Sequence, residues 1–165
     1  MSEQQGVAAG AGAVVVGVDG SESARTAVAV ALREADRRDR PVVAVMAYDA
    51  PDLWMMEIGG QSLDRRELQR QVEVVARSVV DGVIAEVREE GVEIPEVRVL
   101  AGPGSPAEVL CRVAQDAELL VVGHRGRGGL ASRLIGSVGL GVVVHAACPV
   151  LVVRPTPPVS AGRPR

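Results

Sequence analysis

The sequence predicts a single-domain α/β protein with an open, doubly wound parallel sheet of five strands and helices on both faces. The main observation is a set of short apolar runs, most of them nearly continuous in Val and Leu, as expected for strands buried on both faces. These runs cover residues 13–18, 41–48, 96–102, 118–123 and 149–154. Helical patterns lie between the runs, and this alternation, with right-handed crossovers, is typical of a parallel sheet.

Composition supports one domain and argues against several classes of protein. The chain has 165 residues, 47% of them hydrophobic, which suits a single core. Phe is absent, with one Trp and one Tyr, so small aliphatic residues must fill the core and stacking on nucleic-acid bases is not expected. No apolar run approaches the roughly 20 residues of a membrane span, and the opening stretch lacks a signal peptide's charged start. We therefore expect a cytoplasmic protein without nucleic-acid or membrane partners, its domain at 12–154 and disordered tails at 1–11 and 155–165.

Cap residues mark the starts of two predicted helices. In "SESARTAVAVALREADRRD" the cap candidates are Ser21 and Ser23. In "GSPAEVLCRVAQDA" Ser105 is the predicted N-cap, Pro106 lies in the first turn, and Glu108 follows three residues after the cap. This second pattern predicts a capping box.

The other two helices are predicted from their apolar residues. A long helix is expected within residues 63–91 because apolar residues recur there at three-to-four spacing. Its predicted core-facing residues are Leu68, Val72, Val75, Val79, Val83 and Val87. The last helix, within 136–147, is almost wholly apolar, and such a helix is buried or paired. Two hypotheses stay open: an additional contact surface, testable by a charge at Val142 or Val144, and a helix tucked under the long connection at 49–62.

Positive charge and glycine concentrate in "GHRGRGGLASRLIGSVG", residues 123–139. Residues 1–118 carry 12 Arg and 21 acidic residues, whereas residues 119–165 carry 6 Arg and no acid. A local positive field in an acidic protein favours a small anionic ligand. Glycines let main-chain amides approach an anion, and a helix start at Ser137 favours negative charge.

These features suit a polyphosphate, with charge supplied by three arginines of the stretch. The arginines are Arg125, Arg127 and Arg133. Asp19, in the loop after the first strand, would better accept hydrogen bonds from a ribose or base. If the first and fourth strands are neighbours, both loops face one crevice. The alternative is a flexible glycine-rich surface loop, with Asp19–Ser21 as a turn and helix cap.

Other phosphate and catalytic motifs do not fit the sequence. All 18 basic residues are Arg, so a P-loop lysine and a Schiff base are excluded. "GRGGLA" at 126–131 matches a dinucleotide-binding variant, but no acid follows Glu118 to bind the ribose. His124 and His145 are the only histidines and have no clustered acid, which argues against a metal site or a catalytic triad.

Three segments together resemble the universal stress protein family, in the subset with a G-2x-G-9x-G-S motif. They are "VVVGVDGSESA" at 14–24, Gly123-x2-Gly126-x9-Gly136-Ser137, and "HAACPVLVVR" at 145–154. The similarity covers roughly residues 13–154. The resemblance implies the strand order 3-2-1-4-5 and ATP bound in the crevice. It also implies a homodimer that pairs through the last strand, Val150–Val153.

The resemblance also implies a set of nucleotide-binding residues. Asp19 would contact the ribose or adenine, with Gly17 beside it, while the backbone of Ala47 would meet the adenine edge and Gly123 would lie near the ribose. The full predicted set is Gly17, Val18, Asp19, Ala47, Gly123, His124, Arg125, Gly126, Arg127, Gly128, Gly136, Ser137 and Val138. Gly126, Arg127 and the three residues from Gly136 would surround the phosphates. A bridging Mg²⁺ or Mn²⁺ would be held by phosphates and water, so no protein metal ligand or catalytic residue is predicted.

The function expected from these observations is that of an ATP-binding regulatory or stress-response module. Bound nucleotide would order the crevice loops and bias the dimer or a partner. Two alternatives stay open: weak ATP hydrolysis at the same site, for which the motif offers no clear general base, and a protein that dimerises without nucleotide.

Overall fold

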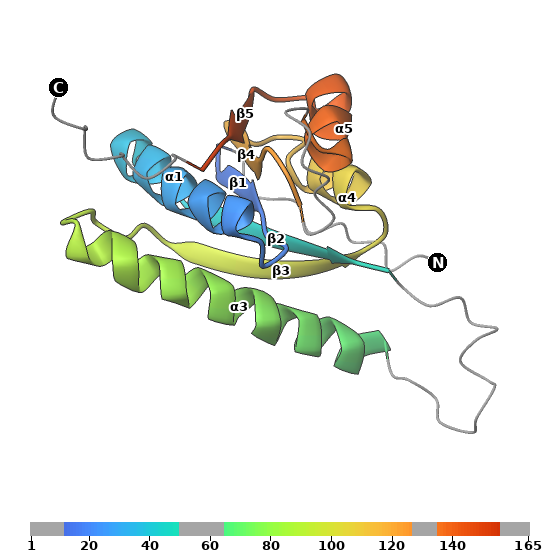
Figure 1. Cartoon of the computed structure of the whole chain (residues 1–165), viewed down its shortest axis with the longest axis horizontal. Helices are drawn as coiled ribbons and strands as arrows, with labels where there is room; N and C mark the ends of the chain where they lie inside the picture. The colour runs from blue at the N-terminus through green and yellow to red at the C-terminus, as the bar shows by residue number, and fades with distance from the viewer. Residues whose placement is uncertain (1–11, 50–64, 127–134, 156–165) are drawn as a thin grey trace, which may run out of the picture.

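A computed structural model describes residues 12–49, 65–126 and 135–155 of the chain (Figure 1). Nearly all of both predicted tails and most of the 49–62 connection lie outside these ranges. The predicted domain bounds, 12–154, therefore stay a prediction.

The sheet has five parallel strands in the order β3-β2-β1-β4-β5, which confirms the predicted fold class and strand order. The strands are β1 (Val14–Gly17), β2 (Val42–Tyr48), β3 (Val97–Pro103), β4 (Leu119–Gly123) and β5 (Val150–Val153). β1 is central: Val16 pairs with Ala44 of β2 on one side and with Val121 of β4 on the other. Because β1 and β4 are neighbours, the loops that follow them leave the same edge of the sheet.

Helices cover both faces of the sheet, as predicted. α1 (Glu22–Arg38) and α3 (Arg65–Glu89) pack on one face, and α4 (Pro106–Val113) and α5 (Ser137–His145) pack on the other (Figure 1). Alternate strand residues serve the two layers: Val14 and Val16 point to α1 and α3, and Val15 points to α4 and α5. Burial on both faces explains why β1, β2 and β4 are nearly continuous apolar runs.

The start of α1 resolves a choice that the sequence left open. Ser21 is the N-cap, and its hydroxyl accepts a hydrogen bond from the amide of Ala24 at 3.1 Å. Ser23 instead lies inside the first turn and is buried. The helix ends at Asp39, whose φ of 52° is left-handed.

Two details of the predicted helices are wrong. Val75 is 49% exposed, because the buried stripe of α3 runs through Ala76 and Val80 to Val83 and Val87. Ala76 follows Val75 by about 100° around the helix, and a small residue is easily missed in a pattern of larger ones. Ser105 is the N-cap of α4, but its side chain makes no capping hydrogen bond. Glu108 therefore contributes only its negative charge to the first turn.

α3 is the longest helix in the described ranges, at 25 residues. Neither it nor any other helix described there is both long enough and apolar enough to cross a bilayer.

Candidate functional site at the carboxyl edge of the sheet

The loops after β1 and β4 meet at Asp19 and Gly126. A Cβ atom at Gly126 would lie 2.8 Å from Oδ2 of Asp19, closer than real Cβ contacts come. The backbone of the β4 loop therefore lies directly beside the carboxylate of the β1 loop. Glycine at position 126 permits this close approach.

Asp19 is fixed by its own turn. Its Oδ1 accepts a hydrogen bond from the amide of Ser21 at 2.8 Å. The preceding residue, Val18, donates its amide to the carbonyl of Val45 at 2.9 Å, which ties the loop to β2. Asp19 and Ser21 thus form the turn and cap that one interpretation of the sequence expected. The same turn leaves Oδ2 on the side of Gly126, so this role does not exclude ligand binding.

The start of α5 closes against the β4 loop. The amide of Gly136 donates to the carbonyl of His124 at 2.8 Å, and a Cβ at Gly136 would lie 3.3 Å from that oxygen. Gly136 is the N-cap of α5, so Ser137 and Val138 open the helix. Amides of a first helical turn have no acceptor within the helix and favour negative charge. The G-9x-G spacing therefore brings a helix start against residues 124–126.

Gly123 and Gly17, both predicted site residues, have packing roles. A Cβ at Gly123 would lie 2.5 Å from Oγ of Ser23 and 2.8 Å from its carbonyl carbon, so this glycine lets α1 approach the end of β4. A Cβ at Gly17 would lie 3.1 Å from Cδ1 of Leu110 in α4. Ala47 lies near the carboxyl end of β2, two residues beyond Val45.

His124 is held between α1 and β5. Its ring Nδ1 lies 3.2 Å from Oγ of Ser23, and its amide donates to the carbonyl of Val153 at 2.8 Å. The amide of Arg125 also donates to the Ser23 hydroxyl, at 3.4 Å. Burial and the positive charges of Arg125 and Arg154 lower the pKa of His124, although a hydrogen bond to Val153 acts in the opposite direction. This lowering of the pKa favours the neutral form of the His124 ring.

Ser23 belongs to this cluster, although the sequence suggested it only as a candidate helix cap. It is 6% exposed, and it bonds the two residues that follow Gly123. In the sequence it resembles any small polar residue at a helix start, so no signal marks its contacts with His124 and Arg125.

Some predicted residues lie outside the described ranges, namely Arg127, Gly128 and Arg133. Within the described residues, no group of three or more His, Cys, Asp or Glu side chains could hold a metal ion.

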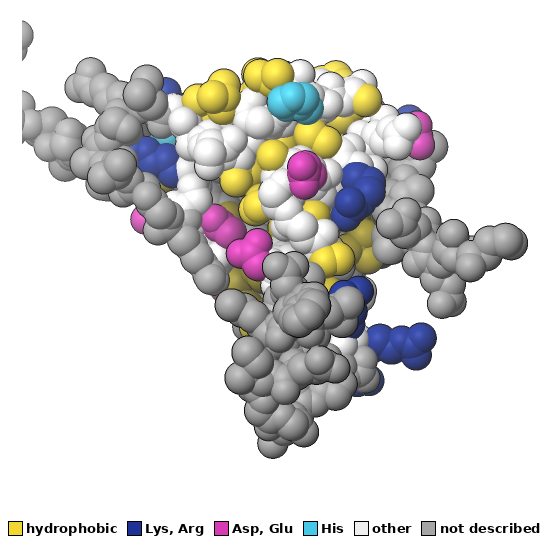
Figure 2. Space-filling model, turned by 90° about the vertical axis from the view of Figure 1, so that its right-hand side faces the viewer, with side chains coloured by type: hydrophobic (Ala, Val, Ile, Leu, Met, Phe, Trp, Pro, Cys, Tyr) yellow, Lys and Arg dark blue, Asp and Glu magenta, His cyan; other side chains and the backbone are white. Residues whose placement is uncertain are grey.

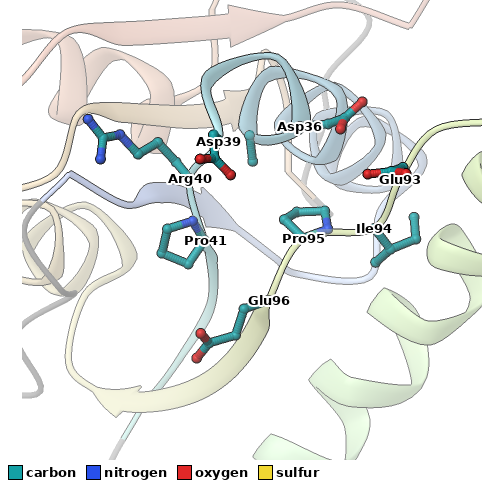
Figure 3. A pocket seen from close by; sticks show the side chains of 9 residues that line it. Asp36, Asp39, Arg40, Pro41, Glu93, Ile94, Pro95 and Glu96 are labelled. Atoms are coloured by element: carbon teal, nitrogen blue, oxygen red, sulfur yellow. The ribbon is translucent and has the colours of Figure 1, made fainter.

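A concavity lies at the opposite, amino edge of the sheet (Figure 3). Its volume is about 290 Å³, and its lining includes the carboxylates of Asp36, Asp39, Glu93 and Glu96. Its one lining arginine, Arg40, donates to Glu118 at 2.8 Å. Four carboxylates disfavour an anionic ligand at this edge of the sheet.

Comparison with known proteins agrees with this architecture. A model of the universal stress protein family matches residues 11–154. A universal stress protein of Mycobacterium bovis is 37% identical over 141 residues, which make up 86% of this chain and 45% of that protein. One from Thermus aquaticus is 33% identical over 144 residues, 86% of this chain and 97% of that protein. A solved universal stress protein in complex with cAMP has a TM-score of 0.61 at 25% identity, covering 87% of this chain and 97% of its own.

The chain spans a little under half the length of the mycobacterial relatives and nearly all of the Thermus relative. The family match extends from before β1 to the residue after β5 and so includes both loops of the candidate site. On this evidence the chain belongs to the universal stress protein family.

Proposed function

We propose that the protein is an ATP-binding regulatory module of the stress-response type, whose homodimer or partner state is biased by bound nucleotide. The observation that carries this proposal is the close approach of Asp19 to Gly126. A Cβ atom placed on Gly126 would lie 2.8 Å from Oδ2 of Asp19. It puts a hydrogen-bond acceptor and a bare stretch of main chain side by side. The cytoplasmic location expected from the sequence stays a prediction.

The two halves of the site suit the two halves of a nucleotide. Oδ2 of Asp19 can accept a hydrogen bond from a ribose or base, since Oδ1 already accepts from Ser21. Amides at the start of α5, against residues 124–126, suit phosphoryl oxygens. The relative solved with cAMP supports an adenine nucleotide as the ligand class. A bridging Mg²⁺ or Mn²⁺ would neutralise phosphate charge and would be held by the phosphates and water.

The Asp19→Asn substitution is expected to weaken the contact with the nucleoside without weakening the contact with the phosphates. Asn keeps an oxygen that can accept from the Ser21 amide but replaces Oδ2 with an NH₂ group, which cannot accept. We expect the affinity for ATP to fall at least about 10-fold, the loss of one charge-assisted hydrogen bond. Binding of inorganic triphosphate should be unchanged or tighter. Isothermal titration with ATP, AMP, cAMP and triphosphate measures this, with Asp36→Asn, in the opposite concavity, as the matched control.

The wild-type titration decides between the proposal and its alternatives. No binding of any adenine nucleotide would favour a protein that dimerises without nucleotide. Binding with phosphate release above the buffer rate, lost in Asp19→Asn, would favour a weak ATPase. Equal loss of ATP and triphosphate in Asp19→Asn would contradict the assignment of Asp19 to the nucleoside.

The homodimer is proposed to form through β5, whose only strand neighbour among the described residues is β4. The carbonyls of Pro149 and Val153 accept from β4, from Leu120 and His124. Backbone groups of successive strand residues point to opposite sides, so the amide of Val152 faces the free edge. An apolar edge strand with free amides is a template for a second strand.

Val152→Pro is therefore expected to abolish the dimer. Proline removes the amide of Val152 from the free edge and leaves the bonds to β4, and an edge strand tolerates proline where its amide faces outward. Sedimentation velocity should show wild-type dimers and Val152→Pro monomers with unchanged circular dichroism. A Val152→Ala variant, which keeps the amide, should remain dimeric. A dimeric Val152→Pro protein would contradict pairing through β5.

A further inference from the structure

We propose that Ser23 is a positioning residue of the candidate site, whose buried hydroxyl fixes both the main chain after β4 and the tautomer of His124. The hydroxyl accepts a hydrogen bond from the amide of Arg125 and donates one to Nδ1 of His124. The consequence for ligand affinity rests on the proposed function, whereas the consequence for the tautomer does not.

The hydroxyl of Ser23 lies inside the protein and bonds residues that are distant in the chain. Its Oγ lies 3.2 Å from Nδ1 of His124 and 3.4 Å from the amide nitrogen of Arg125. Figure 2 views the molecule from the carboxyl edge of the sheet, where acidic and basic side chains reach the surface. Ser23 is only 6% exposed and contributes almost nothing to that surface. Its hydroxyl therefore depends on partners within the protein.

The glycine at position 123 leaves room for this hydroxyl. A Cβ at Gly123 would lie 2.5 Å from Oγ of Ser23, closer than real Cβ contacts come. Gly123 is also the first glycine of the G-2x-G-9x-G-S motif. The missing Cβ thus lets the Ser23 hydroxyl reach the two residues that follow β4.

The direction of each hydrogen bond follows from the chemistry of the partners. The amide of Arg125 can only donate, so Oγ of Ser23 accepts there. The hydroxyl proton then needs an acceptor, because a buried donor without one is costly, and Nδ1 of His124 lies within reach. Nδ1 therefore accepts, and the proton of the neutral ring lies on Nε2. Burial and the charges of Arg125 and Arg154 lower the pKa of His124, which agrees with a neutral ring.

The other histidine of the chain provides an internal reference with the opposite tautomer. Nδ1 of His145 lies 2.9 Å from the carbonyl oxygen of Gly141. A carbonyl oxygen only accepts, so the neutral ring of His145 carries its proton on Nδ1. We therefore expect the two histidines to be neutral in opposite tautomers.

Fixing Arg125 also places the glycine that follows it. The carbonyl of His124 accepts from the amide of Gly136 at 2.8 Å, and a Cβ on Gly136 would lie 3.9 Å from the amide nitrogen of Gly126. Residues 124–126 are thus held by the start of α5 and, through Ser23, by α1. A main chain that is in position before the ligand arrives binds more tightly. Ser23 supplies this position through residues 124 and 125.

Long-range proton–nitrogen NMR of the full chain at alkaline pH measures the tautomers. We expect His124 to have a bare Nδ1 and His145 a bare Nε2, and the His145→Gln spectrum assigns the two sets of signals. Ser23→Ala should convert His124 to a mixture of tautomers and leave His145 unchanged. The matched control is Thr26→Ala, which removes a hydroxyl bonded to the carbonyl of Glu22 in the same helix and should change neither signal.

The affinity for inorganic triphosphate tests the positioning of the main chain. Ser23→Ala should weaken both triphosphate and ATP about 10-fold, as the loss of one or two net hydrogen bonds does. Asp19→Asn, by contrast, should weaken ATP alone, and Thr26→Ala should weaken neither.

The outcomes separate this inference from the proposed function. A wild-type protein with the His124 proton on Nδ1 would overturn the assigned hydrogen bond, and this measurement needs no variant to fold. Unchanged triphosphate affinity in a folded Ser23→Ala protein would overturn the positioning role. A wild type that binds neither ATP nor triphosphate would overturn the proposed function, and the tautomer of His124 would still decide the role of the Ser23 hydroxyl.

Discussion

Replacing Gly126 by valine is expected to abolish ATP binding and leave the fold intact. Even the Cβ of alanine would lie 2.8 Å from Oδ2 of Asp19, and the carboxylate would have to move away. That atom is the end of a side chain, so the shift costs the folded state little. A ligand loses both the position of Asp19 and the bare backbone beside it. Gly126→Ala should lower ATP affinity about 100-fold, about 2.7 kcal/mol, and Gly126→Val should eliminate it.

Gly82→Ala is the matched control for this experiment. A Cβ at Gly82, in α3, would make an ordinary contact of 3.5 Å with Arg25, so ATP affinity should not change. Titration calorimetry gives the affinities, and urea unfolding checks that each variant is folded. A folded Gly126→Val protein with wild-type ATP affinity would refute the assignment of this loop to the phosphates.

Gly123→Ala is expected to cause a large loss of stability, unlike the substitutions at Gly126, which should leave the fold intact. Its Cβ would lie 2.5 Å from Oγ of Ser23, 2.8 Å from the Ser23 carbonyl carbon and 2.9 Å from the carbonyl oxygen. Two of these atoms are main chain of α1, so relief requires the helix and β4 to separate. Such overpacking should lower the free energy of unfolding by about 3 kcal/mol, measured by urea denaturation.

Ser23→Ala provides a second check on the cause. It removes Oγ but leaves the main-chain carbonyl, so the Gly123→Ala/Ser23→Ala double variant should stay destabilised. Gly126→Ala, the same change three residues later, should unfold within about 0.5 kcal/mol of wild type, as surface changes usually do. A Gly123→Ala protein as stable as Gly126→Ala would show that α1 does not limit the room at Gly123.

The contrast between these two glycines also marks how far the sequence can predict the site. The sequence analysis predicted that the loops after β1 and β4 share one edge if these strands are neighbours, and the strand order confirms that they are. The family resemblance assigned Gly123 and Gly126 alike to the ligand. Only tertiary packing distinguishes them, because α1 approaches one and Asp19 approaches the other. The contacts of Ser23 escaped prediction for the same reason, since its partners lie about a hundred residues away in the chain.

The fold was more predictable than the site because strand burial has a direct signature. Runs of Val and Leu without polar alternation require cover on both faces, and that pattern marks most of the strands; in β3, which is only partly buried, Arg98 lies between Val97 and Val99. Helix faces were less certain. In α3 the apolar residues form two stripes offset by one residue, one through Val75 and one through Ala76 and Val80. Packing on β2 and β3 buries the second stripe.

Among the described residues the core contains no aromatic side chain, and this shapes how the protein resists mutation. The largest fully buried residues are two leucines, Leu32 and Leu120, followed by valines. Truncating a valine removes only two methyl groups, about 1.6 kcal/mol of transfer free energy before any cavity cost. The stability of the core is therefore spread over many small aliphatic side chains of similar size. Truncating one core side chain therefore lowers the free energy of unfolding only modestly. Adding a single methyl group where two backbone segments touch lowers it much more.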